Sequence, residues 1–263
     1  MRTSMLAVAV TVAATMTAGA QTPPPNPNQM FVRALTGLNS VNVSSLVYSG
    51  SGTVSMPASA GAPPTSAQPL APVAKYTVAI NYGMMSSRTE IERTTAPKKV
   101  TQFLSEGMTW NVTDGKAPVP MPRAVKGRER QIWMTPHGIL KAAQEPTSRR
   151  QMANATGPDG QPVTTMTFVV AGWQMKATLN AAAMIERVEA TREDLERMSG
   201  DPAGDSIEIV YGDYKDYDGI KFPTHIVQKQ NGQTMLDIVV TEVRPNAGLY
   251  VEVPAKVQKA VRR

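Results

Sequence analysis

The sequence predicts a mainly β protein of the α+β class, in which two or three helices cover one face of an antiparallel sheet. Between residues 46 and 112, segments with strand-like alternation of apolar and polar residues follow one another as a meander. Residues 123–144 break this pattern with apolar side chains at helical spacing. Near the end, Asp218-Gly219 and Asn231-Gly232 favour the positive backbone angles of tight hairpin turns.

The individual elements are predicted from the spacing of apolar residues. A first helix is expected over residues 30–38, and Pro136 is expected to begin the second helix of the 123–144 segment, because its missing N–H does no harm in a first turn. The uncharged segment 57–72 is rich in Ala, Pro and Ser and predicts a mobile loop. Residues 191–198 are compatible with a helical turn or a charged loop. Strands are predicted over 46–56, 74–82, 86–94, 99–105, 109–112, 162–170, 174–179, 184–190, 206–215, 220–229 and 234–243.

The first 20 residues have the features of a cleavable secretory signal peptide. Arg2 precedes an uncharged apolar run over residues 5–17, and small residues come before Gln21. The run is shorter than the roughly 20 residues of a spanning helix. We therefore expect cleavage near Ala20 and a periplasmic or secreted, soluble chain without a transmembrane anchor. The proline-rich segment 21–28 is expected to be a tether.

Composition narrows the class of protein. The chain has 263 residues and no cysteine, which excludes a disulfide framework, a thiol nucleophile and a thiolate metal site. Its net charge of +6 is mild, and basic residues alternate with acidic ones except at 123–130 and in the tail, 255–263. Because nucleic-acid-binding proteins cluster their basic residues, no nucleic-acid partner is expected. Residues 29–254 are long enough for a single domain with its own core.

The residue types that carry catalysis or bind metals do not form a recognisable motif. His137 and His225 are the only histidines, and neither has a neighbouring ligand at metal-site spacing. Three aspartates precede Gly219, but the spacing does not fit a calcium loop. We expect no enzyme activity, metal or cofactor, although a site assembled from distant residues stays open. The 16 methionines fit either an adaptable binding surface or a core that is short of aromatic residues.

Two segments resemble a known family. Residues 211–228 (YGDYKDYDGIKFPTHIVQ), with a strand that ends EVRPN at 242–246, resemble the closing hairpins of periplasmic lipoprotein-carrier-like domains. This is the superfamily of the lipoprotein chaperone LolA and its outer-membrane receptor LolB. Residues 130–143 (RQIWMTPHGILKAA) resemble uncharacterised exported bacterial proteins built on this domain. Some of those proteins carry a metallo-β-lactamase-type hydrolase after it, whose metal-ligand motif is absent here.

The resemblance implies a curved open antiparallel sheet, a half-barrel, whose concave apolar face is covered by helices. It also implies a hydrophobic ligand on that face, either a lipid or a lipidated peptide such as the acyl chains of a lipoprotein, and a possible carrier role. Arg88 is the candidate counterpart of the arginine that gates the carriers' lid. The alternative is a structural or adaptor domain that binds another envelope protein. The residues expected to line the concave face, each equally compatible with plain core, are Val100, Phe103, Trp110, Trp133, Ile139, Leu140, Met166, Phe168, Met175, Leu236 and Ile238.

Overall fold

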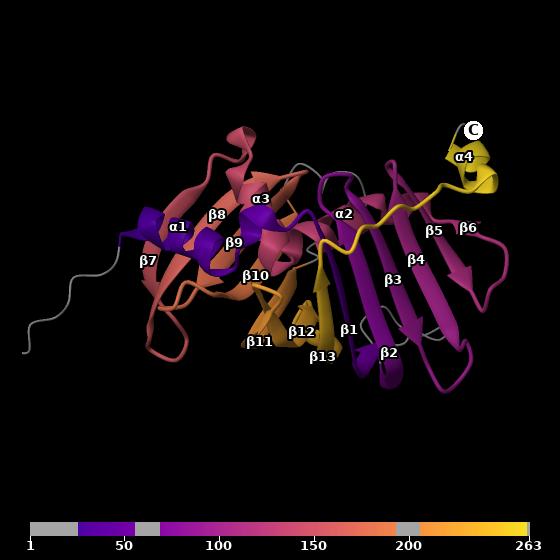
Figure 1. The fold of residues 1–263 in the computed structure, drawn as a ribbon, viewed down its shortest axis with the longest axis horizontal. Coiled ribbons are helices and arrows are strands. Elements are labelled where there is room, and N and C mark those ends of the chain that lie inside the picture. The colour runs from indigo at the N-terminus through magenta and orange to yellow at the C-terminus, as the bar shows by residue number, and fades with distance from the viewer. Residues whose placement is uncertain (1–25, 56–68, 193–205, 262–263) are drawn as a thin grey trace, which may run out of the picture.

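The computed structural model describes residues 26–55, 69–192 and 206–261, and in these ranges it has four α-helices and one antiparallel sheet of thirteen strands (Figure 1). The helices are α1 (Pro27–Gly37), α2 (Val125–Met134), α3 (Pro136–Gln144) and α4 (Ala255–Val261). The strands are β1 (Ser45–Ser55), β2 (Leu70–Asn81), β3 (Ser86–Glu92), β4 (Lys99–Ser105), β5 (Met108–Thr113), β6 (Val119–Pro120), β7 (Gln151–Thr156), β8 (Pro162–Val170), β9 (Trp173–Leu179), β10 (Ile185–Arg192), β11 (Ile207–Tyr217), β12 (Ile220–Gln230) and β13 (Gln233–Pro245).

The first strand of the sheet, β1, and the last, β13, lie side by side at its centre. From β1 the chain moves outward strand by strand to one edge at β6, and from β7 at the other edge it returns inward to β13, which pairs with β1. The two edges are consecutive in sequence. The connection between them contains α2 and α3, so these helices have to cross the width of the sheet.

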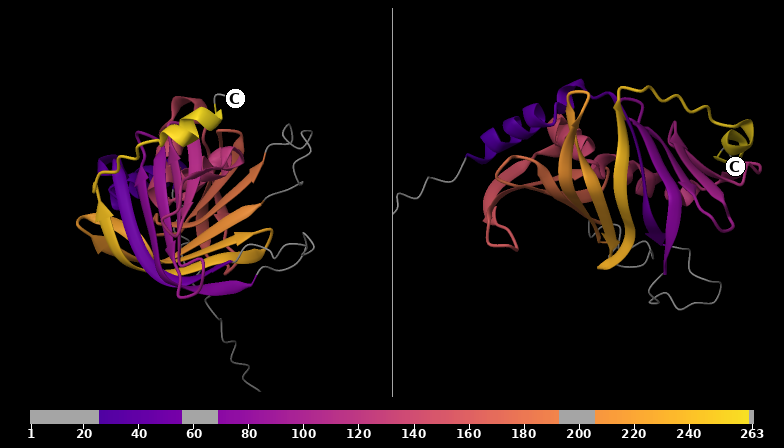
Figure 2. Two further views of the ribbon diagram at one scale, coloured as in Figure 1. Left: turned by 90° about the vertical axis from the view of Figure 1, so that its right-hand side faces the viewer. Right: turned by 60° about the horizontal axis from the view of Figure 1, so that its bottom comes forward.

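The sheet is bent into an open trough, with α1, α2 and α3 on its concave side (Figure 2). Apolar residues of the three helices and of the inward-facing strand positions form one continuous core, in which Ala34, Ile132 and Leu140 are almost completely buried. On β13, Ile238 and Val240 are buried in this core while Val239 between them is 55% exposed. The predicted fold class, an open antiparallel half-barrel with covering helices, is confirmed.

The hairpin turns form at the predicted dipeptides. Asp218 and Gly219 have φ values of 50° and 81°, and Asn231 and Gly232 have φ values of 49° and 80°. Asp218 and Asn231 tolerate positive φ because their short side chains bond locally, and glycine has no Cβ to clash. These turns fix the register of β11, β12 and β13.

A second, smaller apolar cluster lies on the convex face of the sheet. After β13 the chain crosses the strands β1 to β5 as an extended outer strap (residues 246–254) and ends in α4, which contacts β5 and β6 (Figure 1). Alternate strap residues, Leu249, Val251 and Val253, are buried against the sheet. The Ser105 hydroxyl donates to the Val251 carbonyl oxygen at 2.8 Å. The strap therefore covers part of the convex face of this half of the sheet.

Several predicted boundaries change. Helix α1 begins at Pro27, inside the predicted tether, because the Asn26 side chain accepts a hydrogen bond from the Asn28 backbone N–H and caps the first turn. Strand β2 begins at Leu70, inside the predicted 57–72 loop, and the predicted basic tail contains α4, whose Val257 is completely buried. The signal peptide, residues 57–68 and residues 193–198 lie outside the described residues.

The edge strands β6 and β7 have no counterpart among the predicted strands. Strand β7 reads QMANAT and has no alternation of large apolar and polar residues, since nearly all of its side chains are exposed. Its conformation is held by hydrogen bonds to β8. A pattern of side-chain burial does not reveal a strand that is ordered mainly by backbone pairing.

Gly50 should be essential to the central strand pair. A β-bulge shifts the β1–β13 register between Ser49 and Gly50, and a Cβ on Gly50 would lie 2.1 Å from the Val239 carbonyl oxygen. We expect Gly50→Ala to lower the free energy of unfolding by about 1–3 kcal/mol, because the backbones have to separate. Urea denaturation measures this change. Gly127→Ala in α2, where an added Cβ meets nothing within 4 Å, is the control and should not destabilise the protein.

Candidate ligand-binding cleft

An open cleft of about 710 Å³ lies on the concave side, between the first half of the sheet, β12, β13 and α2. Its described lining comes from inward-facing positions on β3, β4 and β5, together with residues of β1, β2, β12 and β13 and one residue of α2. The volume is in the range of small-molecule binding sites. The lining residues are Val54, Ser55, Tyr76, Thr89, Ile91, Arg93, Pro97, Val100, Gln102, Asn111, Thr113, Gln131, Gln228, Met235 and Leu236.

The cleft is continuous with a smaller, deeper cavity of about 50 Å³. Tyr76, Thr89, Gln131, Gln228 and Leu236 line both spaces. The deeper cavity has a mixed lining of aliphatic side chains and of hydroxyl and amide groups, and its further lining residues are Tyr48, Val78, Ile80, Ser87, Ile132, Thr135, Ile209, Tyr211 and Ile226. Aliphatic side chains of β2, β11, β12 and α2 therefore lie at the inner end beside polar groups.

Three tyrosines of the inner end supply neutral polar groups. Burial raises the pKa of Tyr48, Tyr76 and Tyr211, so all three stay protonated near neutral pH. The Tyr211 hydroxyl donates to the Met134 carbonyl oxygen at 2.6 Å and so ties β11 to the end of α2. Within the described ranges, the hydroxyls of Tyr48 and Tyr76 have no hydrogen bond, which leaves them available to a ligand.

Helix α2 is held over the cleft by the buried side chain of Arg128. Its Nη1 donates to the carbonyl oxygens of Phe103 and Trp110, the latter at 3.0 Å, and its Nη2 donates to Asn111 Oδ1. Burial lowers the pKa of Arg128 to about 10, so the guanidinium is still charged near neutral pH. No carboxylate pairs with it in the described part of the chain. The arginine therefore fixes the position of Gln131, one turn further along the cleft wall.

The structure separates the eleven predicted lining residues into three groups. Val100 and Leu236 line the cleft. Phe103 and Trp110 lie on the convex face, where their rings stack at 5.0 Å in the cluster under the outer strap, so their expected concave placement is wrong. The others belong to the packed core on the concave side, half-buried in the case of Trp133 and almost completely buried in the rest: Trp133, Ile139, Leu140, Met166, Phe168, Met175 and Ile238.

The convex placement of Phe103 and Trp110 follows from the strand register. Val100 and Gln102 of β4 face the cleft, so the alternation turns Phe103 outward, where the strap supplies an apolar cover. Arg88 is also on the convex face, because its neighbours Ser87 and Thr89 line the concave cavities. Its expected role at the lid is therefore wrong.

Sequence reasoning missed the polar residues of the mouth. Gln102 and Asn111 are direct cross-strand partners on β4 and β5, and both line the cleft together with Gln131 and Gln228. The two-residue period of the strands could have revealed Gln102 and Asn111, because it places them on the same face as Val100 and Thr113. The methionines are mostly core residues, and Met235 alone among those described lines the cleft.

The fold is shared with proteins of known structure. A LolA superfamily protein from Nitrosomonas europaea matches with a TM-score of 0.50 and 13% sequence identity over 88% of this chain and 96% of its own. This chain has a LolA-like fold. A DUF1329 family protein from Desulfovibrio piger also matches, with a TM-score of 0.53 and 7% identity over 85% of this chain and 95% of its own. No family model and no curated protein sequence matches the chain.

Within 26–55, 69–192 and 206–261, no group of three or more histidine or acidic side chains is placed to hold a metal ion. In the same ranges no helix has the length and apolar character needed to cross a membrane.

His137 is a buried titratable group beneath the helices. It lies near the start of α3 with its ring stacked on Phe222, 6.0 Å between centroids, and its Nε2–H donates to the Leu38 carbonyl oxygen at 3.1 Å. Its Nδ1 is buried without a hydrogen-bond partner in the described part of the chain. Burial lowers the pKa of His137 to about 4, so the folded protein holds it neutral.

The buried histidine should make the folded state sensitive to acid. Below pH 6.5 the unfolded chain takes up a proton on His137, whereas the folded chain does so only near pH 4. The free energy of unfolding should therefore fall between pH 6.5 and pH 4, by about 3 kcal/mol from this group. Urea denaturation at several pH values measures the decrease. His137→Gln keeps a donor for the Leu38 carbonyl but has no group that titrates, so the part of the decrease that comes from His137 should disappear.

His225→Gln is the matched control, because the side chain of His225 is 43% exposed on the convex face, where its Nε2 lies 2.8 Å from Asp237 Oδ1. A pH dependence that is unchanged in His137→Gln would contradict the assignment.

Proposed function

We propose that this chain is an exported, non-enzymatic module that binds an apolar ligand, a lipid or the acyl chains of a lipidated peptide, in the concave cleft and carries it reversibly. One observation supports this most directly: a preformed cleft of about 710 Å³ shares five lining residues with a deeper cavity beside α2, where Ile80, Ile132 and Ile226 supply apolar surface. The match to a LolA superfamily structure adds support from the fold.

The energetics favour reversible binding. Burial of apolar surface contributes about 25 cal/mol per Å², so an acyl chain that buries several hundred Å² gains several kcal/mol. Loss of translational freedom and desolvation of the mouth offset part of that gain. The remaining affinity suits uptake and release rather than permanent retention.

The chemistry of the lining supports a binding role. The described lining of the cleft holds amides, hydroxyls and one guanidinium, but no carboxylate, imidazole or thiol. Without a general base next to a nucleophile, these side chains can hold and orient a ligand but cannot activate a hydroxyl for attack.

A bulky side chain in the cleft should block binding. Gln228 on β12 lines both the cleft and the inner cavity, and Gln228→Trp should weaken binding of the neutral fluorescent probe N-phenyl-1-naphthylamine by at least about tenfold. Val227→Trp is the matched control, because the strand alternation places Val227 on the convex face. Probe titration measures both variants, with thermal unfolding as a check of folding.

Mass spectrometry of lipids extracted from the natively produced protein complements the titration. A wild-type chain that binds no probe and carries no lipid would rule out the proposed function.

The second candidate is an adaptor for another envelope protein, and the free edge of β7 favours it. Charged residues and proline usually prevent further pairing at a sheet edge. The six residues of β7 include neither. Photo-crosslinking from Ala155 to one reproducible partner, lost when Ala153→Pro is added on the same strand, would favour the adaptor, particularly if the cleft variants have no effect.

A further inference from the structure

We infer that the cleft selects apolar chains that end in an anionic head group, a carboxylate or a phosphate, and that Arg93 binds that head group. The inference rests on the proposed function, since it names the chemistry of the ligand held in the same cleft.

Arg93 continues an inward-facing row of residues to the mouth of the cleft. Thr89 and Ile91 of β3 line the cleft, and Arg93, two positions further, lines it as well. The Arg93 backbone N–H donates to the Lys98 carbonyl oxygen at 2.7 Å, so the connection between β3 and β4 is closed at this point. The guanidinium is therefore carried by an ordered part of the hairpin.

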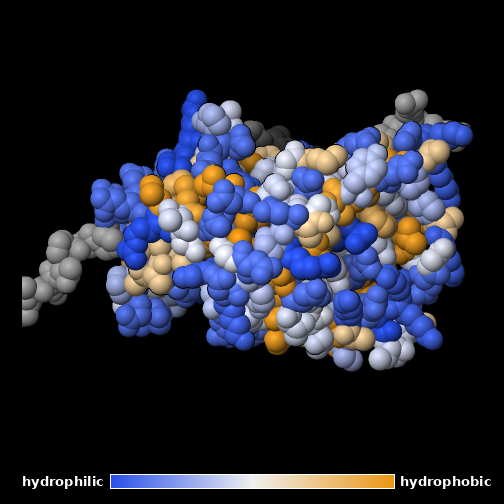
Figure 3. Space-filling view, viewed as in Figure 1, coloured by the Kyte–Doolittle hydropathy of each residue, from blue (hydrophilic) through white to orange (hydrophobic). Residues whose placement is uncertain are grey.

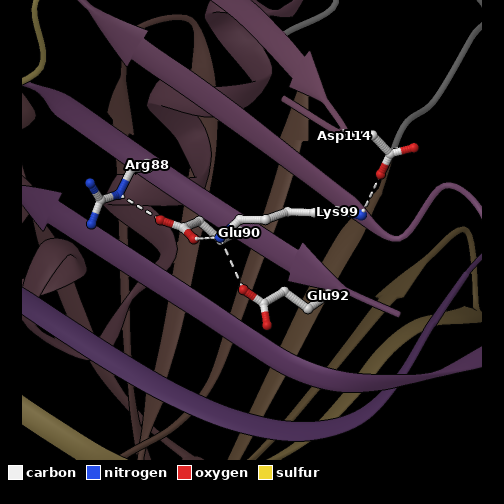
Figure 4. Close-up of polar contacts among 5 residues, drawn as sticks. All are labelled: Arg88, Glu90, Glu92, Lys99 and Asp114. Carbon is white, nitrogen blue, oxygen red and sulfur yellow. Dashed lines mark hydrogen bonds and ion pairs between the residues drawn. The ribbon is translucent and has the colours of Figure 1, made fainter. Parts of the chain in front are cut away.

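Four other charged side chains of this hairpin, Arg88, Glu90, Glu92 and Lys99, are paired with one another on the convex face. Glu90 lies between Arg88 Nε, at 3.0 Å, and Lys99 Nζ, at 2.6 Å (Figure 4). Lys99 Nζ also contacts Glu92 at 3.0 Å. The hydrogen bonds that Lys99 Nζ donates to Glu90, and then to Glu92, raise the pKa of Lys99. This network uses both carboxylates of β3 on the face away from the cleft.

Among the described residues, Arg93 has no anionic partner. Its side chain makes no ion pair or hydrogen bond within the described ranges, and its Nε is buried without a partner. A half-buried guanidinium without a counter-charge is costly, and a carboxylate or phosphate satisfies its planar fork with two parallel hydrogen bonds.

The surroundings of Arg93 are neutral or positive. It is the one charged residue in the described lining of the cleft. Asn111 Oδ1 is occupied by Arg128, which leaves the Asn111 amide N–H groups to donate elsewhere and places a second guanidinium behind the cleft wall. Both features favour an anion over a cation at the mouth.

The distance between the mouth and the inner end suits an amphiphile. Ser87, Thr89, Ile91 and Arg93 form one inward-facing row, and Ser87 lines the deeper cavity. Six residues of strand span roughly 20 Å at about 3.3 Å per residue. A head group at Arg93 can therefore send a long acyl chain toward Ile132 and Ile226, which line the inner end.

The test compares two fluorescent chains that differ only in the head group, cis-parinaric acid and its methyl ester. The wild-type chain should bind the acid about tenfold or more tightly than the ester. Arg93→Gln should bring the acid to the affinity of the ester and leave the ester unchanged, whereas Arg93→Lys should keep part of the preference. Thermal unfolding verifies that the variants are folded.

Lys98→Gln is the matched control, because it removes the same charge from an exposed position of the same hairpin and should keep the preference. Decyl phosphate should displace the acid, whereas inorganic phosphate at the same concentration should not. Equal affinity for acid and ester in the wild type, or displacement by inorganic phosphate, overturns the inference while the proposed function stands. Failure to bind either probe overturns the proposed function itself.

Discussion

The pairing of β1 with β13 is the constraint on which the rest of the structure depends. It brings together strands that lie about 190 residues apart, as in the hydrogen bond that the Ser49 hydroxyl donates to Glu242, 193 positions away. With these two strands at the centre, β6 and β7 become the edges, and α2 and α3 have to pass over the trough. The cleft lies where this passage leaves part of the concave face unfilled, and β1 meets β13 closely because Gly50 has no side chain.

The two halves of the trough differ in how their concave face is filled. Under α3 the face is closely packed, with Ile139, Met166 and Met175 completely buried. Under α2 the cleft stays open, and Arg128 holds the helix over it through hydrogen bonds to β4 and β5. Apolar surface on the face shown in Figure 3 occurs in small separate areas, the largest of them over α1. The cleft is therefore the more strongly supported site for an apolar ligand.

The fold could be predicted from the sequence to the extent that local patterns specify it. Alternation in β11 to β13 and the turns at Gly219 and Gly232 give the strands and their order, and Pro136 marks the start of α3. The face on which an aromatic side chain lies depends on distant partners. Phe103 and Trp110 look like cavity residues until the outer strap, more than 130 residues later, is known to cover them. The two-residue spacing from Ile91 to Arg93 is enough to place Arg93 on the same, concave face of the sheet. A prediction of lining residues that considers only apolar side chains does not include it.

The outer strap and α4 also make the two ends of the sheet unequal. At one end, β6 has only two residues and α4 packs beside it, while at the other end β7 presents six residues to solvent. Addition of strands is therefore favoured at one end only. Two copies that joined edge to edge through β7 would leave no equivalent edge for a third, so association of this kind would stop at a closed pair and could not grow into a fibre.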